Sequence, residues 1–192
     1  MKKEPVLKRT VAFVDGQNLF HMARKAFGYP YPNYDILGLA SEVCSREGLR
    51  LVGTRFYTGV PEPAADPFWS GFWRAKTAVM GRQGVFVFTR PIRRGKEKGI
   101  DVRIAIDVIR MAHRGELDVA LLFSQDQDLS EVADEIRLIS REQDRWLRIV
   151  SAFPCSARAE NQGGIDRTDW IRIDRATYDR CLDSRDYRPP RR

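Results

Sequence analysis

Short apolar runs rich in β-branched residues alternate along this chain with longer segments of helical periodicity. They are VAFV at 11–14, LVGTRFY at 51–57, VFVF at 85–88, VALLF at 119–123 and LRIVSA at 147–152. Strands that alternate with helices pair in parallel, because each crossover helix carries the chain back to the same edge of the sheet. The pattern therefore predicts a parallel β-sheet with helices packed against it.

The segments between these runs have apolar residues at i, i+3 and i+4, which is typical of amphipathic helices. The expected helices are at about 17–27, 36–47, 67–82, 99–114 and 128–142. Right-handed crossovers then give an α/β three-layer sandwich with a central parallel sheet. In such a fold ligands bind beyond the carboxyl ends of the strands, so the residues that follow each strand are the first to consider.

A length of 192 residues predicts a single domain. We expect that domain to span 9–174, after an N-terminal extension at 1–8. Its last apolar run is WIRI at 170–173, which follows the loop SARAENQGGIDRTD. The segment 175–192 is basic and lacks a sustained apolar stripe, so we expect a partly ordered C-terminal tail.

Charge and cysteine content narrow the class of protein. The formal net charge of +7 predicts a field that attracts polyanions, among which nucleic acid is the usual partner. Three widely spaced cysteines, Cys44, Cys155 and Cys181, indicate neither a disulfide framework nor a zinc site. No apolar run of about 18 residues predicts a membrane span, and no secretory signal is recognisable. A cytoplasmic protein with reduced thiols is expected.

Four aspartates are expected at the carboxyl edge of the sheet. Asp15 directly follows VAFV, and Asp126 lies just beyond VALLF, with Asp128 two residues later. If the strands at 11–14 and 119–123 are neighbours, about 4.8 Å apart, these carboxylates converge. Asp101 lies in the opening turn of the helix that begins near residue 99.

Each of these aspartates also has an ordinary structural explanation. The helix dipole favours Asp101 and Asp128 at helix starts, and Asp15 before Gly16 fits turn chemistry. As a set they are harder to explain in this way, because converging carboxylates repel one another unless a cation lies between them. Ligands that are all oxygen favour Mg²⁺ or Mn²⁺, and such ions activate water and stabilise the leaving oxygen of a phosphodiester.

Three polar residues near these acids are candidates for supporting roles. Asn18 would face the same edge and contact a metal-bound water or a phosphate, although capping a helix is an equal alternative. Ser124 is placed to hydrogen-bond a carboxylate or phosphate, or is simply a polar strand end. Lys98, in KGID, is placed to meet a phosphate or is a solvated lysine of a basic loop.

Asp107 lies six residues after Asp101, which on a helix turns it about 120° away. Arg103 and Arg110 stand at i−4 and i+3 from it, so pairing within the helix is its simplest explanation.

Three segments resemble the signature blocks of LabA-like NYN domains, which belong to the PIN-like nuclease superfamily. They are VAFVDGQNLF, KGIDVRIAIDVIRMAHRGELDVALLFSQDQDLSEVADEIR and IDRTDWIRI. The resemblance implies a PIN-like fold with strand order 3-2-1-4-5, acidic metal ligands, and cleavage of RNA or other nucleic acid to leave a 5′-phosphate and a 3′-hydroxyl. The positions it marks are Asp15, Asn18, Asp101, Asp107, Asp126, Asp128 and, more faintly, Asp169.

The sequence departs from the family pattern at two positions in the second block. Gln125 stands where a small residue is usual, and Leu129 stands where an aromatic residue is usual. Neither departure removes a carboxylate, so they bear on the substrate more than on the chemistry.

Two basic loops are expected to border the acidic site and to bind backbone phosphates, although a solvated loop is the alternative. They contribute Arg90, Arg93, Arg94, Lys96 and Lys98 in one loop, and Arg158 and Arg167 in the other.

The segment DPFWSGFWRAKTAVM carries Phe68, Trp69, Phe72 and Trp73 at helical spacing. Aromatic side chains can stack on the bases of single strands, but this spacing favours packing in the core or at a subunit interface.

These observations favour a Mg²⁺- or Mn²⁺-dependent (endo)ribonuclease with nucleic acid as partner, RNA rather than DNA. One alternative is a catalytically silent NYN module with a nucleic-acid-binding or regulatory role. A phosphatase with Asp15 as nucleophile is disfavoured, because that chemistry wants an acid two residues on and Gln17 is there. Nucleotide-binding motifs are absent. The oligomeric state stays open, a homo-oligomer included.

Overall fold

The structure is a computed structural model that describes residues 2–92, 98–157 and 163–189. Its centre is a six-stranded sheet of order β3-β2-β1-β4-β5-β6 in which every pair of neighbours is parallel. The predicted three-layer α/β sandwich and the strand order 3-2-1-4-5 are confirmed, with a sixth strand added beyond β5. The strands are β1 Arg9–Asp15, β2 Arg50–Pro61, β3 Phe86–Ile92, β4 Val119–Phe123, β5 Arg148–Pro154 and β6 Asp169–Ile173.

Four of the helices that the structure describes begin at an aspartate N-cap, whereas α4 and α5 have no side-chain cap. Aspartate side chains accept a backbone N–H in the first turn of α1, α2, α3 and α6, which satisfies a donor that the helix leaves unpaired. The helices are α1 Gly16–Phe27, α2 Ile36–Arg46, α3 Pro67–Arg82, α4 Ile100–His113, α5 Ser130–Glu142 and α6 Arg175–Asp179, with a 3₁₀ turn η1 at Gln127–Leu129.

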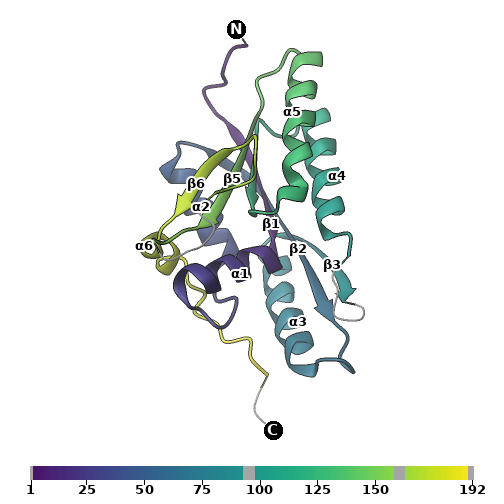
Figure 1. The fold of residues 1–192 in the computed structure, drawn as a ribbon, viewed down its shortest axis with the longest axis vertical. Helices are drawn as coiled ribbons and strands as arrows, with labels where there is room; N and C mark the ends of the chain where they lie inside the picture. Colours follow the sequence, from purple (N-terminus) through teal and green to yellow (C-terminus); the bar gives the residue numbers. More distant parts are fainter. Residues whose placement is uncertain (1, 93–97, 158–162, 190–192) are drawn as a thin grey trace.

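The central strands are buried on both faces, which explains why VAFV and VALLF are continuously apolar. Successive residues of β1 point to opposite sides, so Val11 and Phe13 belong to one hydrophobic core while Ala12 and Val14 belong to the other. Helices α4 and α5 cover the first core, and α1, α2 and α3 cover the second (Figure 1). None of the helices that the structure describes has the length and apolar character needed to span a bilayer.

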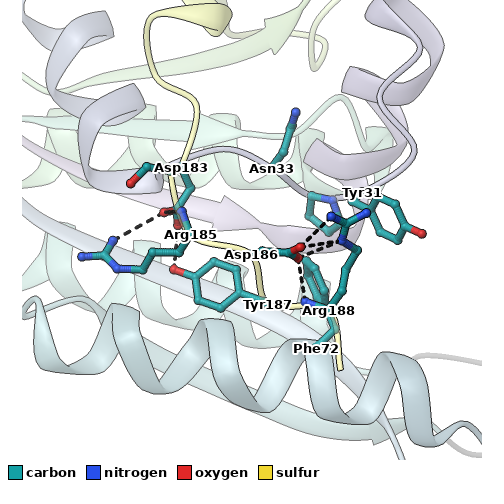
Figure 2. Close-up of a pocket in the computed structure, with 10 residues that line it drawn as sticks. Tyr31, Asn33, Phe72, Asp183, Arg185, Asp186, Tyr187 and Arg188 are labelled. Atoms are coloured by element: carbon teal, nitrogen blue, oxygen red, sulfur yellow. Dashed lines mark hydrogen bonds and ion pairs between the residues drawn. The ribbon is translucent and has the colours of Figure 1, made fainter. Parts of the chain in front are cut away.

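The segment after β6 returns to the core that α1, α2 and α3 cover. Tyr178, Cys181 and Tyr187 are buried there, and Tyr187 packs edge-on against Phe72 of α3, with ring centroids 6.0 Å apart. Figure 2 shows this segment beside Tyr31, with its ion pairs Asp183 to Arg185 and Asp186 to Arg188. The domain boundary after residue 174 stays a prediction.

Lys76 of α3 binds this segment through the Asp183 carboxylate. Its ammonium is buried and donates to the Tyr34 carbonyl at 2.7 Å and to the Asp183 carboxylate at 3.3 Å. Burial lowers the pKa of Lys76 to about 8, although the Asp183 charge opposes this shift.

Candidate metal centre

Three carboxylates from separate parts of the chain meet at the carboxyl edge of the sheet. Asp15 is the last residue of β1, and Asp126 follows the end of β4, which pairs with β1 in parallel. Asp101 lies in the first turn of α4. One ligand oxygen from each of the three lies within 4.8 Å of the others. We call these residues, Asp15, Asp101 and Asp126, the acidic triad.

The strand-to-helix turn at Asp15 positions the first carboxylate. Asp15 is 5% exposed, and its Oδ1 accepts the backbone N–H of Asn18 at 2.9 Å, so it caps α1. A Cβ added at Gly16 would lie 2.4 Å from Cζ of Phe56, which is too close for any side chain. Glycine at this position therefore lets α1 begin directly where β1 ends, with the Asp15 carboxylate fixed at the junction.

Asn18 joins the start of α1 to the loop after β4. Its side-chain oxygen accepts the backbone N–H of Gln125 at 3.0 Å. Capping was one role predicted for Asn18, but the Asp15 side chain performs it and Asn18 supplies the capped N–H. Asn18 thus holds together the two segments that carry Asp15 and Asp126.

Ser124 fixes the turn that presents Asp126. Its hydroxyl is buried and accepts the Asp126 N–H at 3.1 Å, while its carbonyl accepts the hydroxyl of Ser151 at 2.6 Å. The Asp126 Oδ1 in turn accepts the N–H of Asp128 at 3.0 Å, which caps η1. Asp128 is exposed and lies outside the acidic triad, although its charge still reaches Asp101.

The electrostatics of the triad fit a hard cation. Burial, followed by the negative charges of Asp126 and Asp128, raises the pKa of Asp101 above its ordinary value. A divalent cation bound between the three carboxylates would remove this repulsion, and a donor set made only of oxygen suits Mg²⁺ or Mn²⁺. The residues present therefore fit the predicted metal.

Comparison with known proteins identifies the family of the segment that carries the triad. The family model described as the NYN domain matches residues 9–145, which include the whole acidic triad. The chain belongs to the NYN domain family. NYN domains are part of the PIN-like nuclease superfamily, so the predicted family is confirmed at that level, while the narrower likeness to LabA-like members stays a prediction.

One solved structure supports the fold of this NYN domain. A crystal structure of a protein of unknown function from Vibrio parahaemolyticus superposes with a TM-score of 0.61 at 23% identity, over 90% of this chain and 97% of that chain. Identity this low shows a shared fold alone. Comparison with curated proteins finds no match.

Asp107, which the family resemblance marks, lies in a separate ion-pair network of the NYN domain. It is 2% exposed, and its Oδ2 accepts bonds from Tyr57 Oη at 2.9 Å, Arg103 Nε at 3.1 Å and Arg55 Nη2 at 3.2 Å. Burial alone would raise the pKa of Asp107, but these donors outweigh it and the pKa is lowered. The sequence suggested Arg103 and Arg110 as the partners of Asp107. Among the described residues its ion pairs are with Arg103 and with Arg55 of β2.

The predicted basic residues are only partly accounted for by the structure. Arg90 and Lys98 are exposed near the start of α4, and a Cβ added at Gly99 would lie 3.4 Å from Nη1 of Arg90. Arg167 is engaged by α5, where it forms ion pairs with Glu131 at 3.1 Å and with Asp134. Four further predicted residues, Arg93, Arg94, Lys96 and Arg158, lie outside the described residues.

Asp169, the faintest match to the family pattern, does not join the triad. It is the first residue of β6 and lies opposite Val150 near the start of β5, whereas the triad lies where the strands end. Its carboxylate accepts a bond from Arg148 Nε at 2.6 Å.

Two glutamines beside the triad have a structural role that sequence reasoning missed. Gln125 donates to the Gly163 carbonyl at 2.5 Å, and Gln127 donates to the Gly164 carbonyl at 3.0 Å. Gln127 also accepts the Asp166 N–H at 3.0 Å. These bonds join the loop before β6 to the turn that carries Asp126. The only signal in the sequence was Gln125 itself, where the family usually has a small residue.

Proposed function

We propose that this NYN domain is a Mg²⁺- or Mn²⁺-dependent nuclease that hydrolyses phosphodiester bonds in RNA, with Asp15, Asp101 and Asp126 as metal ligands. The observation that carries the proposal is the acidic triad itself. Its three carboxylates come from distant parts of the sequence and lie within 4.8 Å of one another at the ligand-binding edge of a nuclease-family fold.

The chain contributes a rigid donor set. Asp15 is held by its cap bond to Asn18, and Asp126 is held by the buried hydroxyl of Ser124. A preorganised set of this kind loses little free energy when it binds an ion, because its side chains are already oriented. When bound, Mg²⁺ or Mn²⁺ supplies a Lewis acid that activates water and neutralises charge on the phosphate.

Exposed charges near the triad are proposed to position the substrate. Asp128 is a fourth acidic group of the site, and Lys98 and Arg90 at the approach to α4 are candidate phosphate contacts. The net charge of +7 favours a polyanionic substrate. Hydrolysis adds water across the bond between phosphorus and the 3′ oxygen, so the products carry a 5′-phosphate and a 3′-hydroxyl. RNA as the substrate rests on the resemblance to LabA-like domains.

The first test is cleavage of labelled single-stranded and structured RNAs with Mn²⁺ or with EDTA. We expect cleavage only with the metal. Asp15→Asn and Asp126→Asn should each lower the rate by more than the roughly 10- to 100-fold that loss of a ligand's supporting residue costs. Circular dichroism should be unchanged, because asparagine can accept the same capping bonds.

Glu142→Gln is the matched control, since it removes one exposed carboxylate at the end of α5 and should cleave like the parent protein. Cleavage that persists in EDTA, or that both aspartate variants retain in full, would exclude the proposed site.

A further inference from the structure

A cavity of about 620 Å³ opens at the carboxyl ends of β2 and β3, and its lining includes Gln17, two residues after Asp15 of the acidic triad. Gln17 lies in the first turn of α1, and the lining also includes Pro61 and Ile92, the last residues of β2 and β3. Asp15 ends β1, and β1, β2 and β3 are parallel neighbours, so the cavity and the triad share one edge of the sheet. Gln17 ties the first turn of α1 to β2 by donating to the Gly59 carbonyl at 3.3 Å.

One wall of the cavity is aromatic. Phe20 of α1 contacts Trp69 of α3 and His21, with ring centroids 5.9 Å and 5.4 Å away. Of the four aromatic residues predicted as a stripe on this helix, Phe72 and Trp73 are buried, whereas Phe68 and Trp69 keep part of their surface. Packing in the core therefore explains Phe72 and Trp73. Trp69 also packs against the core, but it is half-buried and part of its surface lines the cavity.

The charges around this wall suit an anionic strand that carries uncharged bases. Arg24, on the rim, is exposed and contributes a cation. Asp66 also lines the cavity, but its carboxylate caps α3 by accepting the Trp69 N–H at 3.0 Å. Partial burial, followed by the charges of Arg24 and Lys25, lowers the pKa of His21, which favours the neutral imidazole.

We propose that this cavity binds one nucleobase of a single-stranded substrate, stacked on Trp69 and next to His21, while the adjoining phosphate lies at the acidic triad. The inference rests on the proposed function and adds to it a base-binding site at the aromatic cavity. The cavity volume lies in the range of small-molecule sites, roughly 300–1,000 Å³, which accommodates a nucleotide. A base inside a duplex has its faces covered by its neighbours, so only an unpaired strand can offer one.

The experiment is an abasic scan of a fluorescein-labelled single-stranded RNA of about 12 nucleotides, with binding measured by anisotropy in EDTA and at low salt. Each RNA of the set lacks one base at a successive position. Because stacking of one base is worth about 1–3 kcal/mol, we expect the parent protein to lose roughly 5- to 150-fold in affinity at one or two adjacent positions only.

Trp69→Leu should weaken binding of the intact RNA by a similar factor and abolish the dependence on that position. Trp69→Phe keeps a ring in the cavity, so it should retain part of the dependence on abasic position. Trp146→Leu is the matched control at the other edge of the sheet and should behave like the parent protein. If Trp69→Leu perturbs packing, Arg24→Ala at the exposed rim gives a second variant that should weaken binding at every abasic position alike.

The outcomes separate this inference from the proposed function. If Trp69→Leu loses affinity at the same abasic positions as the parent protein, the cavity does not bind the base. That result would leave the acidic site untouched. Position-dependent binding without metal-dependent cleavage would support the cavity and overturn the nuclease. Absence of RNA binding by the parent protein in EDTA would overturn the cavity alone, because the proposed nuclease is tested by cleavage with the metal present.

Discussion

Asp15 caps a helix and faces two other carboxylates at the same time. Its Oδ1 accepts the Asn18 N–H, and one of its oxygens is also within 4.8 Å of oxygens from Asp101 and Asp126. Capping and metal binding are therefore compatible uses of one side chain, because a carboxylate has several lone pairs on two oxygens. The cap bond makes the turn rigid, and the same rigidity orients the carboxylate toward the triad.

Asp101 provides a test of the triad that does not depend on catalysis. Its carboxylate is disfavoured in the folded protein, since burial and the charges of Asp126 and Asp128 raise its pKa. Replacing it by asparagine removes that repulsion, so Asp101→Asn should melt higher than the parent protein at pH 7 in EDTA. With excess Mn²⁺ the difference in melting temperature should narrow or change sign, because the parent protein gains ion-binding free energy that the variant has lost.

The sign of the pH dependence comes from the direction of the shift. The charged Asp101 carboxylate costs stability above its raised folded pKa, and the cost disappears as the pH falls below its ordinary value near 3.9, where the group is protonated in both states. The melting difference in EDTA should therefore shrink toward pH 4. Differential scanning fluorimetry measures it, with Glu142→Gln as control. A variant that melts lower than the parent protein in EDTA and is indifferent to Mn²⁺ would show Asp101 to be structural.

At the scale of elements, the sequence predicted the central strands and the helix positions well, because burial on both faces leaves a continuous apolar run. Boundaries that depend on tertiary contacts were less accurate. Strand β2 continues to Pro61 rather than 57, since its last residues pair with β3 up to Ile92. A helix was predicted from residue 128, but Asp126 caps the 3₁₀ turn η1 and α5 begins at Ser130.

The same limit applies to the candidate site. Strand ends could be located in the sequence, and this is why Asp15 and Asp126 were expected to converge. The bond between Asn18 and Gln125 and the capture of Asp107 by Arg55 join elements far apart in the chain. No local periodicity encodes such contacts. The helical spacing could place Arg103 beside Asp107, but not Tyr57 and Arg55, which reach the same carboxylate oxygen from β2.

The start of β1 is joined to the start of β4 by an ion pair that should be visible in the pH dependence of stability. Arg9 donates its backbone N–H and Nε to Asp118 Oδ2, each at 3.0 Å, and Nη2 to Oδ1 at 2.8 Å. Burial alone would raise the pKa of Asp118, but the bonds from Arg9 and the charges of Arg9 and Arg145 outweigh it and lower the pKa. Asp118→Asn should reduce the free energy of unfolding at pH 7 by about 1–3 kcal/mol.

Because the folded pKa of Asp118 is depressed, this stabilisation is present above the unfolded value near 3.9 and is lost as the pH falls through the lower folded value. Urea unfolding at pH 7 and near pH 3 should thus show a difference between parent and variant that is large at the first pH and small at the second. Glu116→Gln, an exposed neighbour, should change stability by less than about 0.5 kcal/mol at both. An equal loss at both pH values would mean that the Asp118 charge contributes nothing.

For the whole molecule, the predicted end of the domain at residue 174 can be tested against the packing of the segment after β6. Tyr178 and Cys181 stand at i and i+3, but this short spacing is not continued to Tyr187, so no sustained apolar stripe marks these residues as core. They are nevertheless buried in the same core as α1, α2 and α3. These residues reach the core because the chain turns back toward α1, α2 and α3 after β6. An antiparallel bridge between Tyr34 and Leu182 holds the chain in this position.

Truncation after Asp174 should therefore destabilise the protein. It removes two buried tyrosines, each worth about 3–5 kcal/mol if it behaves like other large aromatic residues, and it deprives the buried Lys76 ammonium of its Asp183 partner. That sum is comparable to the roughly 5–15 kcal/mol by which whole domains are stable, so the shortened chain should melt far lower or fail to fold. Tyr187→Ala in the full chain is the milder variant and should lower the urea midpoint without abolishing cooperative unfolding, while truncation after Pro189 is the control and should match the parent protein. A chain ending at Asp174 that melts like the full-length protein, together with a neutral Tyr187→Ala, would establish the domain boundary at 174 and make the later segment an appendage.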